Sequence, residues 1–472
     1  MVFLFFLAVL ELAVTLWINA RFGLRSIEEI VLTLALPITG VNPRLVLSLS
    51  KRVLSSFLIT GIYVCLLLWS SREREAERSV AYLGLLVFSP ALFLGVNAYY
   101  GRRLGLFSKS RHEYTSLYEE RYRRVEAEDV VFDAKNNVIL ILAESLEETF
   151  NDEELFGKKI MPGLFSLREK NLSFYGYKQV SGTSATISAM TAYLFGLPLF
   201  LPFDINRYGF FSDLFLPSAG SLLEILEKHG YDVFFFAGYD TNFAGGKNIF
   251  NTHLKRPNIR DLPYFKEQSR GVPLELRGWG MPDFKLFEAV KRHFSSMKER
   301  PFFAIIKTSD THAPEGGFFE RLISEEWGDY RDSLAESDWI VSDFVRWTQE
   351  QDFAANTTVI VLGDHLAMTS KVGGISMPDD REIYNVFINP ASTFNIDKIN
   401  KNTQRRAYAA FDLAPTLLES AGGKLPEGRY GLGTSLFRSH LSTLLETKGE
   451  RYYNTEAQKK SVLYQSFFFP RV

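Results

Sequence analysis

The sequence predicts an α/β chain in which N-terminal transmembrane helices precede a domain with a mostly parallel central sheet flanked by helices. Two observations predict this organisation. Long apolar runs gather in the first 100 positions, and beyond position 137 short apolar runs alternate with amphipathic segments. Strands buried on both faces of a parallel sheet have this wholly apolar character. With 472 residues, of which 46% are hydrophobic, the chain can bury a sizeable core.

Three N-terminal segments, residues 1–20, 53–70 and 80–99, approach the ~20 residues that a membrane-spanning helix needs. A fourth segment, 27–50, is interrupted by prolines, a glycine and an arginine, so the region 1–100 is expected to hold three or four transmembrane helices. The first segment lacks a basic start and a small-residue cleavage site, which favours a retained helix over a signal peptide. With either number of spans, cytoplasmic arginine clusters place the remainder of the chain outside the cytoplasm.

Residues 101–136 are strongly charged and are expected to form a solvated juxtamembrane helix and linker. The domain is expected to occupy residues 137–472. Its predicted strands are 138–142, 172–178, 232–237, 302–307 and 358–362, and its predicted helices lie near 161–170, 184–195, 219–229, 283–298, 332–350 and 407–423. The 53 basic residues balance the 55 acidic residues, so nucleic acid is not an expected partner. The single cysteine, Cys65, excludes an intramolecular disulfide.

Polar residues follow two of the apolar runs at the point where each ends. Glu144 comes just after residues 138–142, and Asp364 and His365 come just after residues 359–362. Side chains beyond the carboxyl ends of parallel strands converge on one crevice. Two carboxylates, an imidazole and a hydroxyl in such a crevice suit a divalent metal ion that activates an alcohol.

The hydroxyl is expected from residues 181–190, which follow an apolar strand and open a helix of small residues. The start of a helix favours a phosphate or a developing alkoxide, because unpaired backbone N–H groups point there. An ordinary helix cap explains the same pattern. Five hydroxyl side chains lie within residues 181–188, so spacing alone leaves the nucleophile open.

His312 follows another apolar run and is a candidate for a phosphate contact or a general acid. A structural histidine in a turn before proline is the alternative. His253 is a weaker candidate for substrate binding, and the nearby Lys247 is a candidate for binding an anionic group of the substrate.

Taken together, these segments resemble the membrane-anchored phosphoglycerol and phosphoethanolamine transferases of the alkaline phosphatase and sulfatase superfamily. The resemblance covers most of residues 137–420, in order. It is carried by Ala143–Phe150, Ser181–Thr183 with Thr186, Ile187 and Met190, Gly196–Phe200 with Pro202 and Phe203, Phe243–Gly245, Asp310–His312 with Pro314, and Asp364–Met368.

This resemblance implies a sulfatase-like catalytic domain whose metal ligands are Glu144, Thr183, Asp364 and His365, with Thr183 as nucleophile. Thr183 is selected over Ser184 and Thr186 by its offset from Met190. His312 would contact the substrate phosphate, with Lys247 and His253 as further substrate contacts. One divalent ion is implied, manganese, magnesium or zinc. Unlike many relatives, this chain lacks paired cysteines.

The implied activity is transfer of phosphoglycerol from phosphatidylglycerol in the membrane to a glycan, through a covalent intermediate on threonine. The implied location is the bacterial inner membrane, with several passes and the catalytic domain facing the periplasm or cell exterior. The alternatives are a phosphoethanolamine transferase that uses phosphatidylethanolamine, and a non-catalytic membrane scaffold of the same fold. A sulfatase is disfavoured, because Ser181–Ala185 lacks the proline and arginine of a C/S-x-P-x-R motif.

Overall fold

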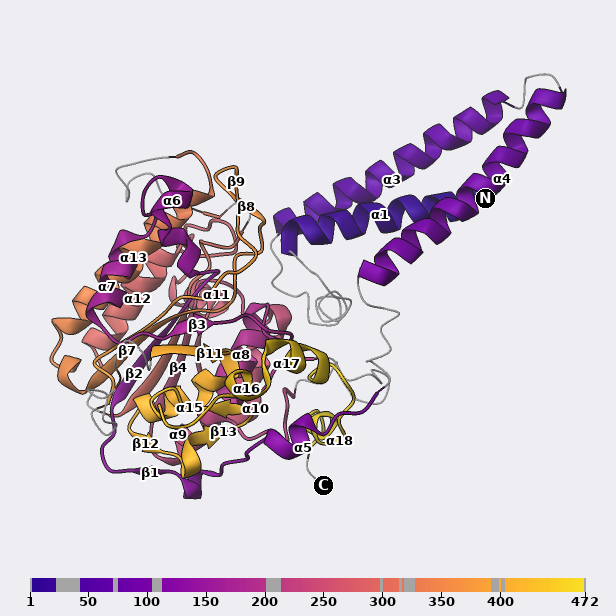
Figure 1. The fold of residues 1–472 in the computed structure, drawn as a ribbon. Coiled ribbons are helices and arrows are strands. Elements are labelled where there is room, and N and C mark those ends of the chain that lie inside the picture. Colours follow the sequence, from indigo (N-terminus) through magenta and orange to yellow (C-terminus); the bar gives the residue numbers. More distant parts are fainter. Residues whose placement is uncertain are drawn as a thin grey trace. The chain divides into compact units, whose positions relative to one another are not determined.

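A computed structural model of the chain describes residues 2–22, 43–70, 75–103, 113–200, 214–297, 300–313, 316–317, 327–391, 399 and 404–470. The chain divides into two compact units (Figure 1). The N-terminal unit contains three helices, among the described residues, and the second unit contains everything described from position 113 onward.

The N-terminal unit consists of α1 (Val2–Phe22), α3 (Pro43–Ser70) and α4 (Glu75–Arg103). Within α3, Val46–Trp69 is long and apolar enough to cross a membrane, whereas the apolar stretches of α1 and α4, Val2–Ile18 and Leu86–Tyr99, are shorter. Residues 27–42 of the expected fourth segment lie outside the described residues. The number of spans therefore stays a prediction.

Polar and aromatic contacts join these three helices. The ring of Phe5 in α1 stacks on that of Tyr63 in α3, with 4.0 Å between centroids. The hydroxyl of Tyr63 lies 2.6 Å from Oγ of Ser89 in α4. Asn97 of α4 donates from Nδ2 to Oε2 of Glu11, 3.0 Å away, so the one acidic residue of α1 has a polar partner inside the unit.

Residues 113–136 differ from the expected solvated linker, because they pack onto the second unit. Leu117 and Tyr118 of the short helix α5 (Leu117–Arg121) are buried, and the Tyr118 hydroxyl donates to the carbonyl of Ala457, 2.8 Å away. Further on, β1 (Val131–Phe132) pairs with β12 (Gly423–Lys424). Apolar residues recur among the charged residues of this segment, and the segment packs because their burial against the second unit is favourable. The folded unit therefore begins well before position 137.

The central sheet has the strand order β10-β7-β2-β6-β4-β5. Its strands are β2 (Asn137–Ala143), β4 (Asp232–Ala237), β5 (Asn258–Arg260), β6 (Phe302–Lys307), β7 (Thr357–Gly363) and β10 (Asn385–Ile388). All neighbours run parallel except β10, which is antiparallel to β7. Every residue of β6 and β7 is buried, as expected of strands covered on both faces. The predicted mostly parallel sheet is confirmed.

Helices cover both faces of this sheet (Figure 1). One layer contains α7 (Pro162–Lys170), α12 (Asp283–Ser295) and α13 (Tyr330–Gln349). The other contains α8 (Thr186–Phe195), α9 (Leu222–Lys228) and α15 (Ala410–Ser420). Ile139 and Ile141 of β2 share an apolar cluster with Leu334 and Phe344 of α13, so alternate residues of the strand serve the two layers.

The predicted strand 172–178 contributes only an isolated antiparallel bridge to the central sheet, between Leu172 and Phe387 of β10. Only β3 (Tyr175–Tyr177) forms there, and it pairs with β11 (Arg405–Tyr408). Gly176 in its middle has a φ of 87°, which interrupts the extended run. The remaining elements of this unit are α6 (Glu153–Phe156), α10 (Gly246–His253), α11 (Leu262–Gln268), α16 (Leu444–Lys448), α17 (Glu450–Glu456), α18 (Val462–Ser466), the β8 (Lys371–Val372) and β9 (Ile375–Ser376) pair, the β13 (Arg429–Tyr430) and β14 (Gly433–Thr434) pair, and several single turns of 3₁₀-helix.

Candidate active site

Two adjacent strands deliver the acidic residues of the site. In the register of β2 and β7, Ala143 lies opposite Gly363, so the residues that follow, Glu144 and Asp364, leave the sheet side by side. His365 comes next. These three side chains are almost wholly buried, and one ligand atom from each lies within 4.8 Å of the others.

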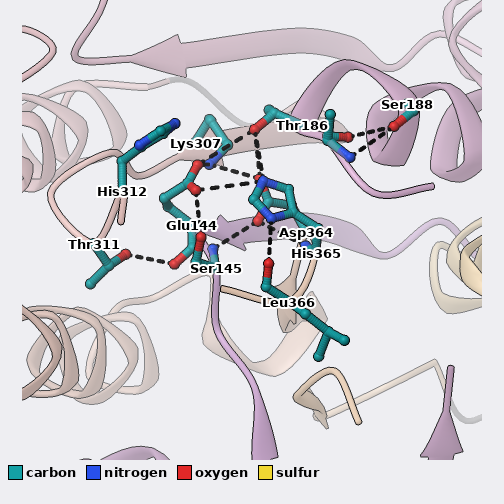
Figure 2. Close-up of polar contacts among 12 residues, drawn as sticks. Glu144, Ser145, Thr186, Ser188, Lys307, Thr311, His312, Asp364, His365 and Leu366 are labelled. Carbon is teal, nitrogen blue, oxygen red and sulfur yellow. Dashed lines mark hydrogen bonds and ion pairs between the residues drawn. The ribbon is translucent and has the colours of Figure 1, made fainter. Parts of the chain in front are cut away.

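The ring of His365 is oriented by the backbone. Its Nδ1 lies 2.9 Å from the carbonyl oxygen of Leu366, which makes Nδ1–H the donor. Nε2 then keeps its lone pair, and it lies 3.5 Å from Oε1 of Glu144 and 3.4 Å from Oδ2 of Asp364 (Figure 2). A histidine fixed in this way presents the ligand atom that metal sites use.

The hydroxyl at this cluster belongs to Thr186. Its Oγ1 donates to Oδ2 of Asp364 at 2.8 Å and lies 3.4 Å from Oε2 of Glu144 and 3.5 Å from Nε2 of His365. Thr186 is the first residue of α8, and Ser188 caps the helix start by accepting from the N–H of Ala185 at 3.0 Å. The helix start therefore holds this hydroxyl at the cluster.

Thr183, the threonine expected as ligand and nucleophile, lies elsewhere. Its Oγ1 donates to the carbonyl of Val180 at 2.8 Å and accepts from the N–H of the same residue at 3.1 Å. The side chain thus closes a turn. The offset from Met190 selected Thr183, but the helix begins at Thr186, two residues later than the predicted start at 184, and Thr186 is the threonine that reaches the cluster.

Ser145 is a residue of the site that sequence reasoning missed. Its backbone is left-handed, with a φ of 56°, which few non-glycine residues adopt. In that conformation its N–H donates to Oδ1 of Asp364 at 2.9 Å, and its Oγ donates to Oε1 of Glu144 at 2.7 Å. One residue with an uncommon backbone conformation therefore orients both carboxylates.

Lys307, the last residue of β6, was also missed. Its Nζ lies 2.7 Å from Oε2 of Glu144, 3.1 Å from Oδ2 of Asp364 and 2.9 Å from the carbonyl oxygen of Thr308. Burial lowers the pKa of this ammonium, but the nearby carboxylates of Asp364 and Glu144 outweigh burial and raise the pKa above its usual value. Lys307 is therefore charged. A lysine closing an otherwise apolar strand was the available signal.

The pKa of the Glu144 carboxyl group is lowered, whereas the pKa of Lys307 is raised. Its burial raises the pKa, yet Lys307 and, to a smaller extent, His365 and His312 lower the pKa well below its usual value. The backbone of Glu144 is held too, because its N–H donates to Oγ1 of Thr308 at 2.9 Å and its carbonyl accepts from Thr311 at 2.6 Å.

His312 lies beside the cluster, on the loop after β6 (Figure 2). Its Nδ1 is 2.9 Å from the carbonyl oxygen of Ala313, so Nδ1–H donates there and Nε2 is left as an acceptor. Its ring centroid is 4.9 Å from that of Trp279. Burial is the main cause that lowers the pKa of His312, which favours the neutral ring.

An open pocket faces this cluster, with an empty volume of about 520 Å³ that includes open solvent. Its polar wall consists of Glu144, Thr186, Lys307, Thr308, Ser309 and His312, and its apolar wall consists of Ile187, Met190, Tyr239, Phe243, Ala244 and Trp279, with Gly246 completing the lining. The reactive groups of one wall thus face an aromatic surface.

The other two expected substrate contacts do not line the pocket. Both ring nitrogens of His253 are engaged, Nδ1 with Glu224 Oε1 at 2.8 Å and Nε2 with the carbonyl of Phe215 at 2.7 Å. Its position on α10 directs this side chain into the core, so His253 is a structural residue. Lys247 follows Gly246, which lines the pocket, but its own side chain is not part of the lining.

The arrangement fits a divalent metal ion. Two carboxylates, the Nε2 lone pair of His365 and the Thr186 hydroxyl form a compact, mainly oxygen-rich donor set. Such a set accepts magnesium, manganese or zinc and does not distinguish among them.

The chain is similar to several known proteins. Curated relatives include phosphoglycerol transferase I from Escherichia coli O6:K15:H31, 29% identical over 335 residues that cover 68% of this chain and 41% of the relative. The protein of that name from Escherichia fergusonii is 30% identical over 313 residues, which cover 64% of this chain and 39% of the relative. The match therefore spans about two fifths of the length of these relatives.

Among solved structures, the integral membrane lipooligosaccharide phosphoethanolamine transferase A from Neisseria meningitidis is similar, with a TM-score of 0.51 and 14% identity over 89% of this chain and 83% of that chain. At this identity the likeness shows the fold. The Sulfatase family matches residues 136–423, which include Glu144, Thr186, Asp364 and His365. This match covers more than half of the chain, so the chain belongs to the Sulfatase family, as its resemblance predicted.

Proposed function

We propose that this chain is a metal-dependent phosphotransferase that moves phosphoglycerol from phosphatidylglycerol to a glycan acceptor, through a covalent intermediate on Thr186. The observation that carries the proposal is the Thr186 hydroxyl at the start of α8, 2.8 Å from Asp364 and within the cluster of Glu144 and His365. The names of the curated relatives support the transferred group.

The residues that would hold the ion are Glu144, Thr186, Asp364 and His365. A divalent ion bound there would stabilise negative charge on the reacting oxygens. The chain itself adds to this effect, because the first turn of α8 directs unpaired backbone N–H groups and the positive end of the helix dipole toward Thr186.

The proposed reaction has two displacements. In the first, Oγ1 of Thr186 attacks the phosphorus of the lipid, the bond from phosphorus to the diacylglycerol oxygen breaks, and the proton lost by Thr186 ends on that oxygen. In the second, an acceptor hydroxyl attacks the phosphorus, the bond to Thr186 breaks, and the acceptor proton returns to Thr186. Splitting one difficult displacement into two is the advantage of covalent catalysis.

We infer that His312 assists the second displacement. Its neutral ring presents Nε2 as an acceptor toward the pocket, so it suits a base that takes the proton of the acceptor hydroxyl. This assignment replaces the general acid considered from the sequence, because a lowered pKa disfavours the protonated ring.

The membrane is the proposed source of the donor. The apolar stretch Val46–Trp69 supports an anchored protein, and anchoring raises the effective concentration of a lipid substrate. We further propose a bacterial inner-membrane protein whose catalytic domain faces the periplasm or cell exterior. A non-catalytic scaffold is disfavoured, since Glu144, Thr186, Asp364 and His365 keep the full donor set.

The test is to trap the intermediate. Full-length protein in detergent is incubated with manganese and with phosphatidylglycerol labelled in its headgroup, quenched in acid, digested and mapped by mass spectrometry. We expect a glycerophosphoryl adduct on Thr186, absent from a Thr186→Ala variant and retained by Thr183→Ala. An adduct on Thr183 would move the nucleophile, and an adduct only with phosphatidylethanolamine would identify a phosphoethanolamine transferase. No adduct with either lipid would contradict the covalent mechanism.

A further inference from the structure

Lys307 occupies an unusual place for a lysine. It closes β6, a strand whose residues are all buried, and its side chain is only 1% exposed. In the parallel register it lies opposite Leu142 on one side and Ala237 on the other, so its Cα is fixed in the middle of the sheet. The side chain leaves the strand at the edge where Glu144 and Asp364 leave theirs.

The Lys307 ammonium donates to Glu144 Oε2 at 2.7 Å and to the Thr308 carbonyl at 2.9 Å, and it forms an ion pair with Asp364 Oδ2 at 3.1 Å. A buried cation is tolerated only when it is paired and hydrogen-bonded in this way. The two carboxylate oxygens that Lys307 contacts are also the ones nearest to Thr186.

The charges of the site change when Lys307 is counted. Glu144 and Asp364 carry two negative charges, and Lys307 balances one of them. The positive charge of Lys307 therefore opposes the binding of a divalent ion by the same two carboxylates.

We propose that Lys307 is a built-in second cation of this site, which holds Glu144 and Asp364 in their positions without an ion and limits the site to a single, less tightly bound divalent ion. The inference rests on the proposed metal site. Lys307 lines the pocket, so its charge also faces the place where an anionic phosphodiester would bind. Sites that handle phosphoryl groups often use a second metal ion for this purpose.

The test compares metal binding by four full-length proteins in detergent: the unmodified protein, Lys307→Met, Lys307→Gln and the control Lys285→Met. Lys285 is an exposed lysine of α12 that pairs with Glu288 at 3.2 Å. Its replacement removes one positive charge, as the Lys307 variants do. Titration calorimetry with manganese gives affinity and stoichiometry, and thermal unfolding with and without manganese gives stability. Neither measurement depends on turnover.

We expect the unmodified protein and Lys285→Met to bind one ion with equal affinity. Both Lys307 variants should bind manganese at least about tenfold more tightly, because the competing positive charge is gone. Without metal, both should unfold at a lower temperature, since two buried carboxylates lose their partner, and manganese should raise their melting temperature more than that of the unmodified protein.

Equal or weaker manganese affinity in the two Lys307 variants would overturn the role of Lys307 and leave the metal site intact. If Lys307→Met does not fold, Lys307→Gln, which keeps hydrogen-bond donors, decides by the same comparison. Failure of the unmodified protein to bind any of manganese, magnesium or zinc would instead overturn the proposed metal-dependent function, and this inference with it.

Discussion

The hydroxyl of Thr186 donates to Oδ2 of Asp364 at 2.8 Å, although 178 positions separate the two residues along the chain. Three positions earlier, Thr183 directs the same chemical group to the backbone of Val180. These two threonines make a matched pair, since they differ in what their hydroxyl contacts and not in residue type.

Replacing Thr186 by valine should therefore remove the nucleophile while keeping the shape of the side chain. Turnover of labelled phosphatidylglycerol should fall at least about a thousandfold, since valine has no oxygen that can attack the phosphorus. Thr183→Val should keep turnover and lose about 1 kcal/mol of unfolding free energy, because it removes one hydrogen bond in a turn. The reverse pattern would show that Thr183 is the nucleophile.

Ser309 is predicted to contact the headgroup of the donor. Its Oγ is buried, lines the pocket and has no hydrogen-bond partner among the residues that the structure describes. Ser309→Ala should raise the KM for phosphatidylglycerol about tenfold, equivalent to one lost hydrogen bond of about 1.4 kcal/mol, with a smaller change in kcat. Ser342→Ala is the control, since that hydroxyl is also buried and unpartnered but lies in α13, outside the pocket lining. An equal KM in both variants would exclude this contact.

His293 is predicted to make the protein less stable in acid. Its ring packs against Phe234, 4.8 Å between centroids, and burial together with the charge of Arg260 lowers its pKa to about 4. The unfolded chain binds a proton near the ordinary pKa of 6.5, before the folded chain does. The stability that this histidine contributes is thus present above pH 6.5 and is lost as the pH falls through that value toward 4.

His293→Phe should flatten this part of the pH dependence. Urea unfolding at pH 7.5 and at pH 5 should show a smaller loss of unfolding free energy in His293→Phe than in the unmodified protein. Replacement of the exposed His440 by phenylalanine should leave the difference unchanged. An acid loss as large in His293→Phe as in the unmodified protein would refute the prediction.

Gly363 is predicted to tolerate no side chain. A Cβ placed there would lie 1.9 Å from the carbonyl oxygen of Leu146 and 2.7 Å from Cγ2 of Ile383. Gly363→Ala should destabilise the protein by about 3 kcal/mol and weaken manganese binding, because the next residue is Asp364. Gly220→Ala is the control, as its Cβ would meet atoms no closer than 3.7 Å. Unchanged melting temperature and manganese affinity in Gly363→Ala would contradict this reading.

The sequence predicted the centre of the fold well, and physical reasons explain where it failed. Buried parallel strands require continuous apolar runs, so β2, β4, β6 and β7 were found within a residue or two of their ends. The edge strands β5 and β10 are short and lack such runs, and their pairing depends on neighbours far along the chain. Among the helices of the two layers, α12 and α13 have the longest amphipathic patterns, which made them easy to predict.

The residues of the site also divide into those that the sequence predicted and those that it missed. Glu144, Asp364 and His365 were predicted to converge because they follow strands, and the register of β2 and β7 brings them together. Thr183 was chosen over Thr186 by its offset from Met190 in the family resemblance, whereas the side chain that reaches the cluster is set by the first residue of the helix, which local patterns locate only to within a few residues. Ser145 acts through a left-handed backbone that no local pattern reveals. Lys307 had a local signal, a lysine at the end of an apolar run, but its pairing with Glu144 and Asp364 depends on strands far apart in the sequence.

The docking of α5 onto the C-terminal helices has a consequence for biosynthesis. Tyr118 reaches its partner carbonyl at Ala457 only after 339 further positions, which at roughly 5–20 residues per second takes about 20–70 s of translation. During that interval α5 has left the ribosome without the surface that will cover it. The residues around Ala457 therefore cover α5 only late in synthesis. A nascent protein truncated before Ala457 would leave α5 exposed to proteases.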